Sequence, residues 1–338
     1  MPGTSPAPRH RAPLPAPRIA VAGAAALLAA CAGEQSSLDP RGPAAAAAAE
    51  AWWVMLVGAS AIFALVMGLV IYATLRAPER RPRLRPNPFI LVGGLLFPIT
   101  VLTALLIYGT TVGRRMVFAG EVPTLRIEVT GHQWWWEVRY PADAERGWAE
   151  AVTANELWLP VGELAEITVR SVDVIHSFWI PQLGGKLDMI PGRDNTLRLM
   201  AEAPGEFRGQ CAEFCGAQHA LMSFVATAAP MEEFEAWRRS REVGGPAAAV
   251  PAGAAALGDA GCAACHQLPG GPAPEEAGPD LRHVGARAMV LGRRGFDREY
   301  IGRFLTDPQR VKPGNRGHLR GVGDDEVDGL LDAMETLR

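Results

Sequence analysis

Two long uncharged segments near the N-terminus restrict the folds that are open to this chain. Residues 51–75 and 86–113 contain no Asp, Glu, Lys or Arg, which gives runs of 25 and 28 residues. An α-helix of about 20 apolar residues is long enough to cross the hydrocarbon core of a bilayer. One such run could be the buried core helix of a soluble protein. Two runs joined by a short loop instead predict a transmembrane helical hairpin.

The loop between the two runs carries most of the local positive charge. Its one acidic residue is Glu79, and it has five arginines: Arg76, Arg80, Arg81, Arg83 and Arg85. Cytoplasmic loops of membrane proteins are enriched in Lys and Arg, so this loop is predicted to be cytoplasmic. Arg114 and Arg115 argue more weakly for the opposite orientation. Everything after residue 115 is then expected in the periplasm, at the bacterial inner membrane.

A shorter apolar run precedes the hairpin. Ile19 to Leu28 follows a basic, proline-rich segment and is too short to span a bilayer, as is typical of a signal peptide. It ends in Leu-Ala-Ala-Cys31, which resembles a bacterial lipobox. That resemblance implies cleavage after residue 30 and a lipid anchor on Cys31. The alternative is an ordinary signal peptide with a cysteine there by chance.

From residue 124 the pattern changes to alternation of apolar and polar residues. Leu125, Ile127 and Val129 alternate with polar side chains, and similar runs occur at residues 166–170 and 195–200. A period of two residues is typical of strands with one buried face, and segments with Pro and Gly separate these runs. Residues 119–240 are therefore predicted to form a β-sandwich or barrel.

A compact group of ligand-type residues lies in this region. Cys211, Cys215, His219 and Met222 fall within twelve residues, and His176 lies upstream. Thiolates, imidazoles and a thioether form a soft ligand set that suits copper. One mononuclear copper needs only one thiolate, whereas two thiolates can bridge two coppers that take one imidazole each. Sharing an electron over two coppers lowers the reorganisation that accompanies its transfer.

Three other interpretations of this group were weighed. A Cys211–Cys215 disulfide is possible in an oxidising compartment but leaves His219 and Met222 unexplained. A structural zinc site is possible, but the spacing is unusual for one. Core packing alone does not call for five ligand-type residues in this arrangement. The pattern favours copper.

The spacing C-x3-C-x3-H-x2-M with an upstream histidine resembles the CuA domain of cytochrome c oxidase subunit II. The resemblance covers the hairpin and the middle domain, and it implies a cupredoxin-like fold. It also implies that the backbone carbonyl of Glu213 is a weak copper ligand and that the Glu213 carboxylate reaches a magnesium ion at the interface with subunit I. The implied ligands of the two copper ions are His176, Cys211, Cys215, His219 and Met222.

An aromatic segment agrees with this resemblance. Residues 131–137, Gly-His-Gln-Trp-Trp-Trp-Glu, resemble the family segment beside the copper site. Trp134 matches the tryptophan through which electrons enter CuA, whereas one or two of the three tryptophans are expected to pack in the core. One departure concerns residues 88–94. Many family members carry a glutamate there, at the start of the second helix, but this chain has no acid, which puts a proton-uptake role in doubt.

A second cofactor motif follows an Ala/Pro/Gly-rich segment, residues 241–256, which is predicted to be a linker. Cys262-Ala-Ala-Cys265-His266 is a C-x-x-C-H motif, typical of covalent c-type haem attachment. The two thiols would form thioethers to the haem, and His266 would be the proximal iron ligand. A thioredoxin-like C-x-x-C motif is the alternative, but it does not require His266.

Residues 257–338 are predicted to form a small all-α class I cytochrome c domain. Gly278-Pro279-Asp280-Leu281 resembles the cytochrome c segment whose proline carbonyl orients the proximal histidine. Near the C-terminus, residues 324–337 have acidic residues at their start and a helical apolar period. All five cysteines of the chain then have a role: lipid attachment, copper binding or haem attachment.

The sixth iron ligand is less clearly specified. Residues 307–316 resemble the loop that delivers an axial methionine, but the chain continues with Gly317-His318 where the family usually has Met-Pro. His318 is therefore the leading candidate, and His283 is a weaker one. The alternative is a methionine or no ligand. The predicted cytochrome domain contains only Met289 and Met334.

The order of the domains resembles subunit II of the caa-type oxidases. It implies transfer of electrons through haem c and CuA to haem a in subunit I, where oxygen is reduced to water and protons are pumped. Expected partners are subunits I and III, with cytochrome c or a cytochrome bc complex as donor, and no nucleic acid. The predicted domains are a signal peptide (1–30), the hairpin region (31–118), the CuA domain (119–240), a linker (241–256) and the cytochrome c domain (257–338).

Other functions fit parts of this pattern. A CuA-containing nitric oxide reductase would use a similar subunit with a different catalytic chain. A copper and haem redox lipoprotein outside any oxidase is a candidate from another class, although delivery proteins usually present one exchangeable metal. A quinol oxidase subunit II is disfavoured because that branch lacks the copper ligands.

Overall fold

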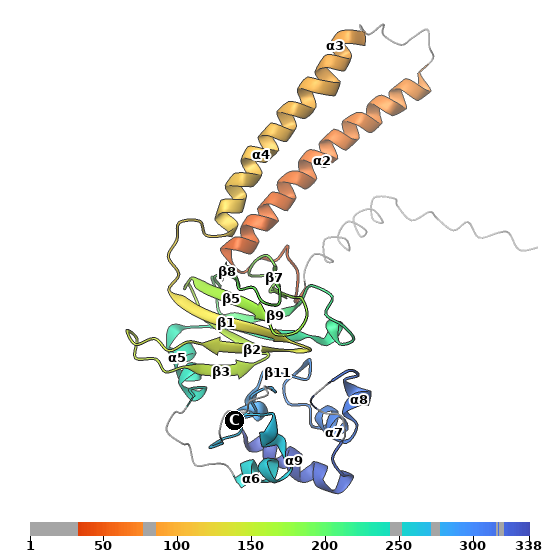
Figure 1. Cartoon of the computed structure of the whole chain (residues 1–338). Coiled ribbons are helices and arrows are strands. Elements are labelled where there is room, and N and C mark those ends of the chain that lie inside the picture. The colour runs from red at the N-terminus through yellow and green to blue at the C-terminus, as the bar shows by residue number, and fades with distance from the viewer. Residues whose placement is uncertain (1–32, 77–85, 244–251, 272–277, 316, 318–320) are drawn as a thin grey trace, which may run out of the picture.

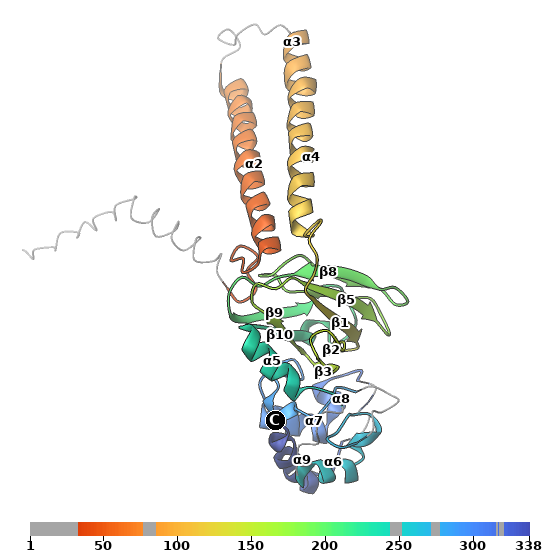
Figure 2. The same ribbon diagram turned by 90° about the vertical axis from the view of Figure 1, so that its left-hand side faces the viewer.

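The computed structural model describes residues 33–76, 86–243, 252–271, 278–315, 317 and 321–338. It has three parts: a helical hairpin, a β-sandwich and a mostly helical C-terminal domain (Figure 1). The hairpin and the C-terminal domain lie on opposite sides of the sandwich, as Figure 2 also shows. The predicted signal peptide with Cys31, most of the arginine-rich loop and His318 lie outside the described residues.

Two long antiparallel helical segments form the hairpin. The first is α2 (Pro43–Leu75). The second consists of α3 (Pro86–Leu91), one π-helical turn η2 (Val92–Leu96) and α4 (Phe97–Met116). Both segments are long and apolar enough to cross a membrane, and their apolar windows are not buried inside the protein. The prediction of two apolar helices is therefore confirmed. A 2.9 Å ion pair between Arg115 and Glu50 joins the helices near the sandwich.

The middle region is a sandwich of two five-stranded sheets, ordered β3-β2-β1-β5-β8 and β4-β10-β9-β6-β7. The strands of the first sheet are β1 (Leu125–His132), β2 (Trp135–Tyr140), β3 (Ala151–Ala154), β5 (Ala165–Ser171) and β8 (Asn195–Leu199). Those of the second are β4 (Glu156–Pro160), β6 (His176–Trp179), β7 (Leu187–Met189), β9 (Gly205–Cys211) and β10 (Ser223–Ala229). Each sheet has one parallel pair, β1 with β5 and β4 with β10.

The core of the sandwich follows from the alternation in the sequence. In β1 and β5 every second residue is buried, because one face of each strand points toward the other sheet. Trp136, Phe178 and Phe224 meet in this core, with ring centroids 4.8–5.8 Å apart. The predicted cupredoxin-like β domain is confirmed. A short helix, α5 (Met231–Ser240), closes it by stacking Trp237 on Trp158.

The C-terminal domain is built mainly from helices around its own core. They are α6 (Ala252–Asp259), α7 (Arg298–Thr306), α8 (Pro308–Val311) and α9 (Asp324–Thr336), with 3-10 turns η4 (Cys262–Ala264) and η5 (Val284–Ala286). A small ribbon, β11 (Met289–Val290) with β12 (Arg293–Arg294), faces the sandwich. The core of this domain includes Leu257, Ile301 and Leu330.

One predicted boundary differs from the structure. Residues 241–256 were expected to be a linker throughout, but α6 begins at Ala252 and packs against α9. Its Ala-rich sequence favours a helix, and Leu257 gives that helix a buried face. Residues 241–243 belong to the sandwich, since Glu242 forms an isolated β-bridge with Ala151. The connection between the two domains is therefore shorter than predicted.

Candidate metal centre and neighbouring cavity

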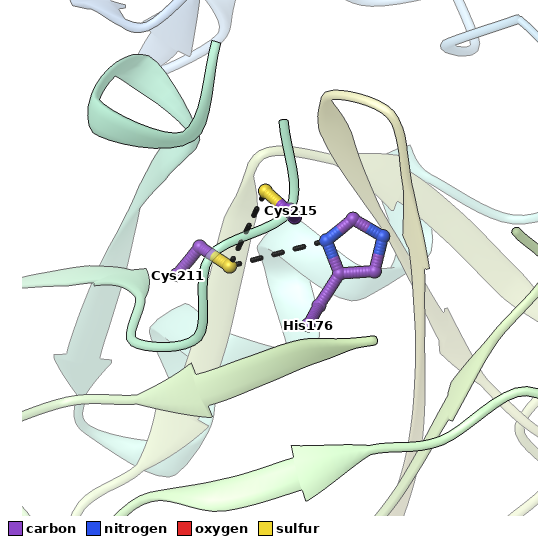
Figure 3. Close-up of side chains that lie close together, drawn as sticks. All are labelled: His176, Cys211 and Cys215. Atoms are coloured by element: carbon purple, nitrogen blue, oxygen red, sulfur yellow. Dashed lines mark hydrogen bonds between the residues drawn. The ribbon is translucent and has the colours of Figure 1, made fainter. Parts of the chain in front are cut away.

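Two thiols and an imidazole form a buried cluster at one end of the sandwich (Figure 3). Cys211 ends β9, Cys215 lies in the following loop, and His176 begins β6. The two sulfur atoms are 3.7 Å apart, and Nδ1 of His176 is 3.9 Å from the Cys211 sulfur. Pairing of β6 with β9 brings His176 to the cysteines across 35 residues of sequence.

The remaining predicted ligands lie beside one or the other of the two sulfur atoms. Nδ1 of His219 lies 3.5 Å from the Cys215 sulfur, and the Met222 sulfur lies 3.8 Å from it. A 3-10 turn, η3 (His219–Leu221), sets the spacing of these two side chains. The backbone carbonyl of Glu213 is 3.2 Å from the Cys211 sulfur. All six groups named from the sequence are thus brought together.

Both cysteines are unbonded in the structure. Their 3.7 Å separation is well beyond a disulfide bond of about 2.05 Å. The hydrogen bond from the Cys215 thiol lowers the pKa of the Cys211 thiol, and the neighbouring His176 ring adds to this effect. One thiolate is therefore favoured before any metal arrives, and a thiolate is the form that binds metal.

A carboxylate orients the buried imidazole. Oδ1 of Asp173 lies 2.8 Å from Nε2 of His176, so Nδ1 faces the sulfur atoms. Burial opposes a charge on this ring, but the hydrogen bonds to Asp173 and Cys211 raise the pKa of His176 overall. Such outer carboxylates fix the tautomer of ligating histidines. Asp173 was not predicted from the sequence, although its position three residues before the histidine was a usable signal.

The three consecutive tryptophans have different environments. Trp136 lies fully buried in the core, and Trp135 stacks on His132 with ring centroids 4.1 Å apart. The indole Nε1 of Trp134 donates a 2.9 Å hydrogen bond to the carbonyl oxygen of Cys215. Nε2 of Gln133 donates to the same oxygen at 2.8 Å. Trp134 is therefore the tryptophan in direct contact with the cysteine loop.

The Glu213 side chain lies at the surface. Its carboxylate is 3.5 Å from Nζ of Lys186, which also forms a 2.8 Å ion pair with Asp188. All three side chains are about half exposed, between 45% and 47%. Phe214 beside it is also exposed. This carboxylate can therefore meet another molecule while its backbone carbonyl faces the cysteine cluster.

A cavity of about 330 Å³ lies between the sandwich and the C-terminal domain. Cys262, Cys265 and His266 form part of its wall. Nδ1 of His266 donates to the carbonyl of Pro279 at 2.7 Å, which makes Nε2 the nitrogen that would bind iron. Burial lowers the pKa of His266, so the ring is neutral, as a ligand must be. At Gly278 a Cβ atom would lie 2.7 Å from the His266 ring, so this approach requires glycine.

Two basic side chains that the sequence analysis missed also line the cavity. Arg287 is buried and donates to the backbone carbonyl of Asp280. Burial lowers the pKa of its guanidinium, although the nearby carboxylates of Glu156 and Asp280 act in the opposite direction. Lys312 is partly buried, and its Nζ donates a 2.9 Å hydrogen bond to the backbone carbonyl of Trp134. The sequence does make Lys312 stand out, because the chain has only two lysines.

The candidates for the sixth iron ligand lie in different places. His318 is outside the described residues, although its neighbour Gly317 lines the cavity. Met334 forms part of the wall, whereas the Met289 sulfur accepts a 3.1 Å hydrogen bond from Ser223 of the sandwich. His283 is not in the cavity wall, and burial lowers its pKa to about 4.

Comparisons with known proteins agree with this geometry. Residues 125–229 match the family described as cytochrome c oxidase subunit II, periplasmic domain. Cytochrome c oxidase subunit 2 of Alkalihalophilus pseudofirmus is 32% identical over 334 residues, covering 91% of this chain and 93% of the relative. The protein of the same name from Bacillus sp. strain PS3 is 32% identical over 232 residues, covering 64% of this chain and 63% of the relative.

A solved structure is also similar. The periplasmic domain of cytochrome oxidase subunit II from Bradyrhizobium japonicum is 34% identical with a TM-score of 0.33, covering 36% of this chain and 95% of that one.

Fold and site together define a membrane-anchored redox subunit with a cupredoxin-like CuA domain. The chain belongs to the cytochrome c oxidase subunit II family. It is the subunit through which electrons enter a terminal oxidase, and it acts with subunit I in a membrane complex.

Proposed function

We propose that this subunit contains its own electron donor, a covalently bound haem c, and passes electrons from it to a binuclear copper centre and on to haem a of subunit I. The observation that carries this proposal is the position of Trp134. Its side chain lines the cavity that contains the C-x-x-C-H motif and also donates a hydrogen bond to Cys215. One side chain therefore contacts both candidate cofactor sites.

For the copper pair we propose that the six groups named above would hold the two ions, with Cys211 and Cys215 supplying the two thiolates. The buried, unbonded thiols and the imidazole held by Asp173 support this assignment, since soft, deprotonated donors select copper. When bound, the two coppers supply a single-electron carrier. The protein contributes a fixed donor geometry and excludes water from the sulfur atoms.

For the haem we propose thioether attachment to Cys262 and Cys265 with His266 as the proximal ligand. The cavity, the Pro279 hydrogen bond and the buried Arg287, which would meet the anionic side of a haem, fit this group. The Alkalihalophilus alignment supports the proposal further. It leaves less than a tenth of this chain unaligned, so it extends into the C-terminal domain.

The finer points of organisation follow from this assignment. We propose a periplasmic CuA domain (119–243) and a periplasmic cytochrome c domain (252–338), after a hairpin region (31–118) and a signal peptide (1–30) with a lipid on Cys31. The exposed Glu213 carboxylate suits a magnesium site at the subunit I interface. Subunit III is a further partner, and cytochrome c or a cytochrome bc complex would supply the electrons.

The test uses paired cysteine variants of the complete chain, purified with its oxidase. Cys262→Ser combined with Cys265→Ser should remove covalent haem, assayed on denaturing gels, and keep both coppers. Cys215→Ser should remove the copper signal and keep the covalent haem. A wild-type chain that has two coppers but no covalent haem would contradict the haem assignment and leave the oxidase subunit II assignment intact.

A further inference from the structure

One loop of the C-terminal domain makes direct contact with Trp134. Nζ of Lys312 donates to the Trp134 backbone carbonyl at 2.9 Å, and Nε2 of Gln218 donates to the carbonyl of Pro313 at 3.3 Å. Gln218 lies in the cysteine loop, directly before His219. The loop that approaches the tryptophan is therefore also hydrogen-bonded to the segment with the copper ligands.

Two glycines meet the ring of Trp134. A Cβ atom on Gly216, at φ +116°, would lie 3.0 Å from Cζ2 of the indole. A Cβ atom on Gly314, at φ +83°, would lie 2.9 Å from Cη2. Both backbone conformations favour glycine, and both positions leave no room for a side chain. The indole is thus in backbone contact with the cysteine loop of one domain and with the 312–315 loop of the other.

The choice of lysine at position 312 is unusual in this chain. Of the 33 Lys and Arg residues only Lys186 and Lys312 are lysines. Lys186 is exposed and paired with carboxylates, whereas no ion pair of Lys312 is found among the described residues. Its ammonium group is directed to a backbone carbonyl instead. A side chain with a compact head on a flexible stem suits this partly buried position.

We propose that Lys312 is a positioning residue for electron transfer: it fastens the haem c domain to Trp134 and so fixes the gap between the haem cavity and the indole. The inference rests on the proposed function, since it requires a haem in the cavity. Among the described residues no hydrogen bond or ion pair joins Lys312 to a proposed copper ligand, and the lysine carries no electron itself. Its effect comes from geometry, because the rate of electron transfer between two fixed centres falls steeply as the distance between them grows.

The variants are made in the complete chain within the purified oxidase. Lys312→Met removes the donor and keeps the length of the side chain, and Lys312→Arg restores a donor. Arg310→Met is the matched control, because Arg310 is an exposed cation two residues away. Gly314→Ala is a second probe, since its new Cβ would push the loop from the indole. Covalent haem and copper are quantified in every preparation.

The measurement is the rate at which photoreduced haem c transfers its electron to CuA, together with the potentials and spectra of both centres. We expect Lys312→Met and Gly314→Ala to slow transfer several-fold, because the rate between fixed centres falls steeply as their separation grows. Both potentials and the CuA spectrum should stay unchanged. Lys312→Arg should recover part of the rate, and Arg310→Met should match wild type.

A wild-type rate in Lys312→Met, with haem and copper fully loaded, would overturn the positioning role and leave the proposed function standing. A slowed rate that is fully explained by a changed potential would also overturn it, because the lysine would then act by charge. Absence of covalent haem in the wild-type preparation would refute the proposed function itself.

Discussion

The indole Nε1 of Trp134 lies 2.9 Å from the carbonyl oxygen of Cys215, although 81 residues separate them in the sequence. This hydrogen bond links the cavity wall to the backbone of a proposed bridging cysteine. The hairpin anchors the sandwich on one side and the C-terminal domain covers the other (Figure 1). The CuA domain is thus positioned between the membrane and the proposed haem.

Replacing Trp134 tests this link. Trp134→Phe keeps an aromatic ring but removes the hydrogen bond to Cys215, so transfer from haem c to CuA should slow several-fold. The free energy of unfolding should fall by only about 1 kcal/mol, the usual contribution of one hydrogen bond. Transient absorption gives the rate. Trp135→Phe is the control, because Trp135 stacks on His132 and, among the described residues, it is Trp134 whose indole donates to Cys215. Equal rates in the two variants would argue against a special role for Trp134.

Copper binding should depend on both thiols. Cys215→Ser should reduce the copper content from two ions to at most one and abolish the spectrum of an electron shared over two coppers. Removing copper by chelation should also lower the thermal midpoint of the sandwich, because the ions bind only the folded state. Metal analysis and electron paramagnetic resonance measure the first effect. Cys262→Ser, a cysteine change outside the cluster, should leave the copper signal as in wild type.

The stability of the docked C-terminal domain should depend on pH through Lys312. Burial lowers the pKa of Lys312 to about 8, below the roughly 10.4 of an unfolded lysine. Between these two pKa values the unfolded chain binds more protons than the folded chain. The free energy of unfolding therefore rises with pH across this range, and this stabilisation is lost as the pH falls through about 8. The thermal midpoint of wild type should therefore rise relative to that of Lys312→Met from about pH 7 to about pH 9.5. If the thermal midpoints of wild type and Lys312→Met change in parallel with pH, the predicted link between the Lys312 pKa and stability is wrong.

The sixth iron ligand can be assigned by paired variants. His318 stays the prediction from the sequence, while Met334 is the methionine in the cavity wall. His318→Ala should convert the haem from low-spin to high-spin, and Met334→Leu should leave it low-spin. Two imidazole ligands should also give a lower potential than one imidazole and one thioether. If the Met334→Leu variant loses the low-spin spectrum instead, the sixth iron ligand is Met334 and not His318.

Local sequence patterns were sufficient for the separate parts. The uncharged runs predicted the two helices because a span of the bilayer needs only length and apolarity. Period-two alternation predicted the β domain because strands bury one face. Five of the six proposed copper-binding groups lie in one twelve-residue segment, so the metal chemistry was evident before the fold. The linker boundary at Ala252 was missed, because an Ala-rich segment is helical only if it finds a packing partner.

By itself, the sequence determined which ligand motifs this protein carries, because ligand spacing within a short segment is a local property. Only the tertiary structure decided how the sites are connected. His176 beside Cys211, and Lys312 and Gly314 against Trp134, belong to elements far apart in the chain. Their proximity results from sheet pairing and from the docking of two domains. Such contacts depend on the packing of the whole surface, so no pattern of neighbouring residues specifies them.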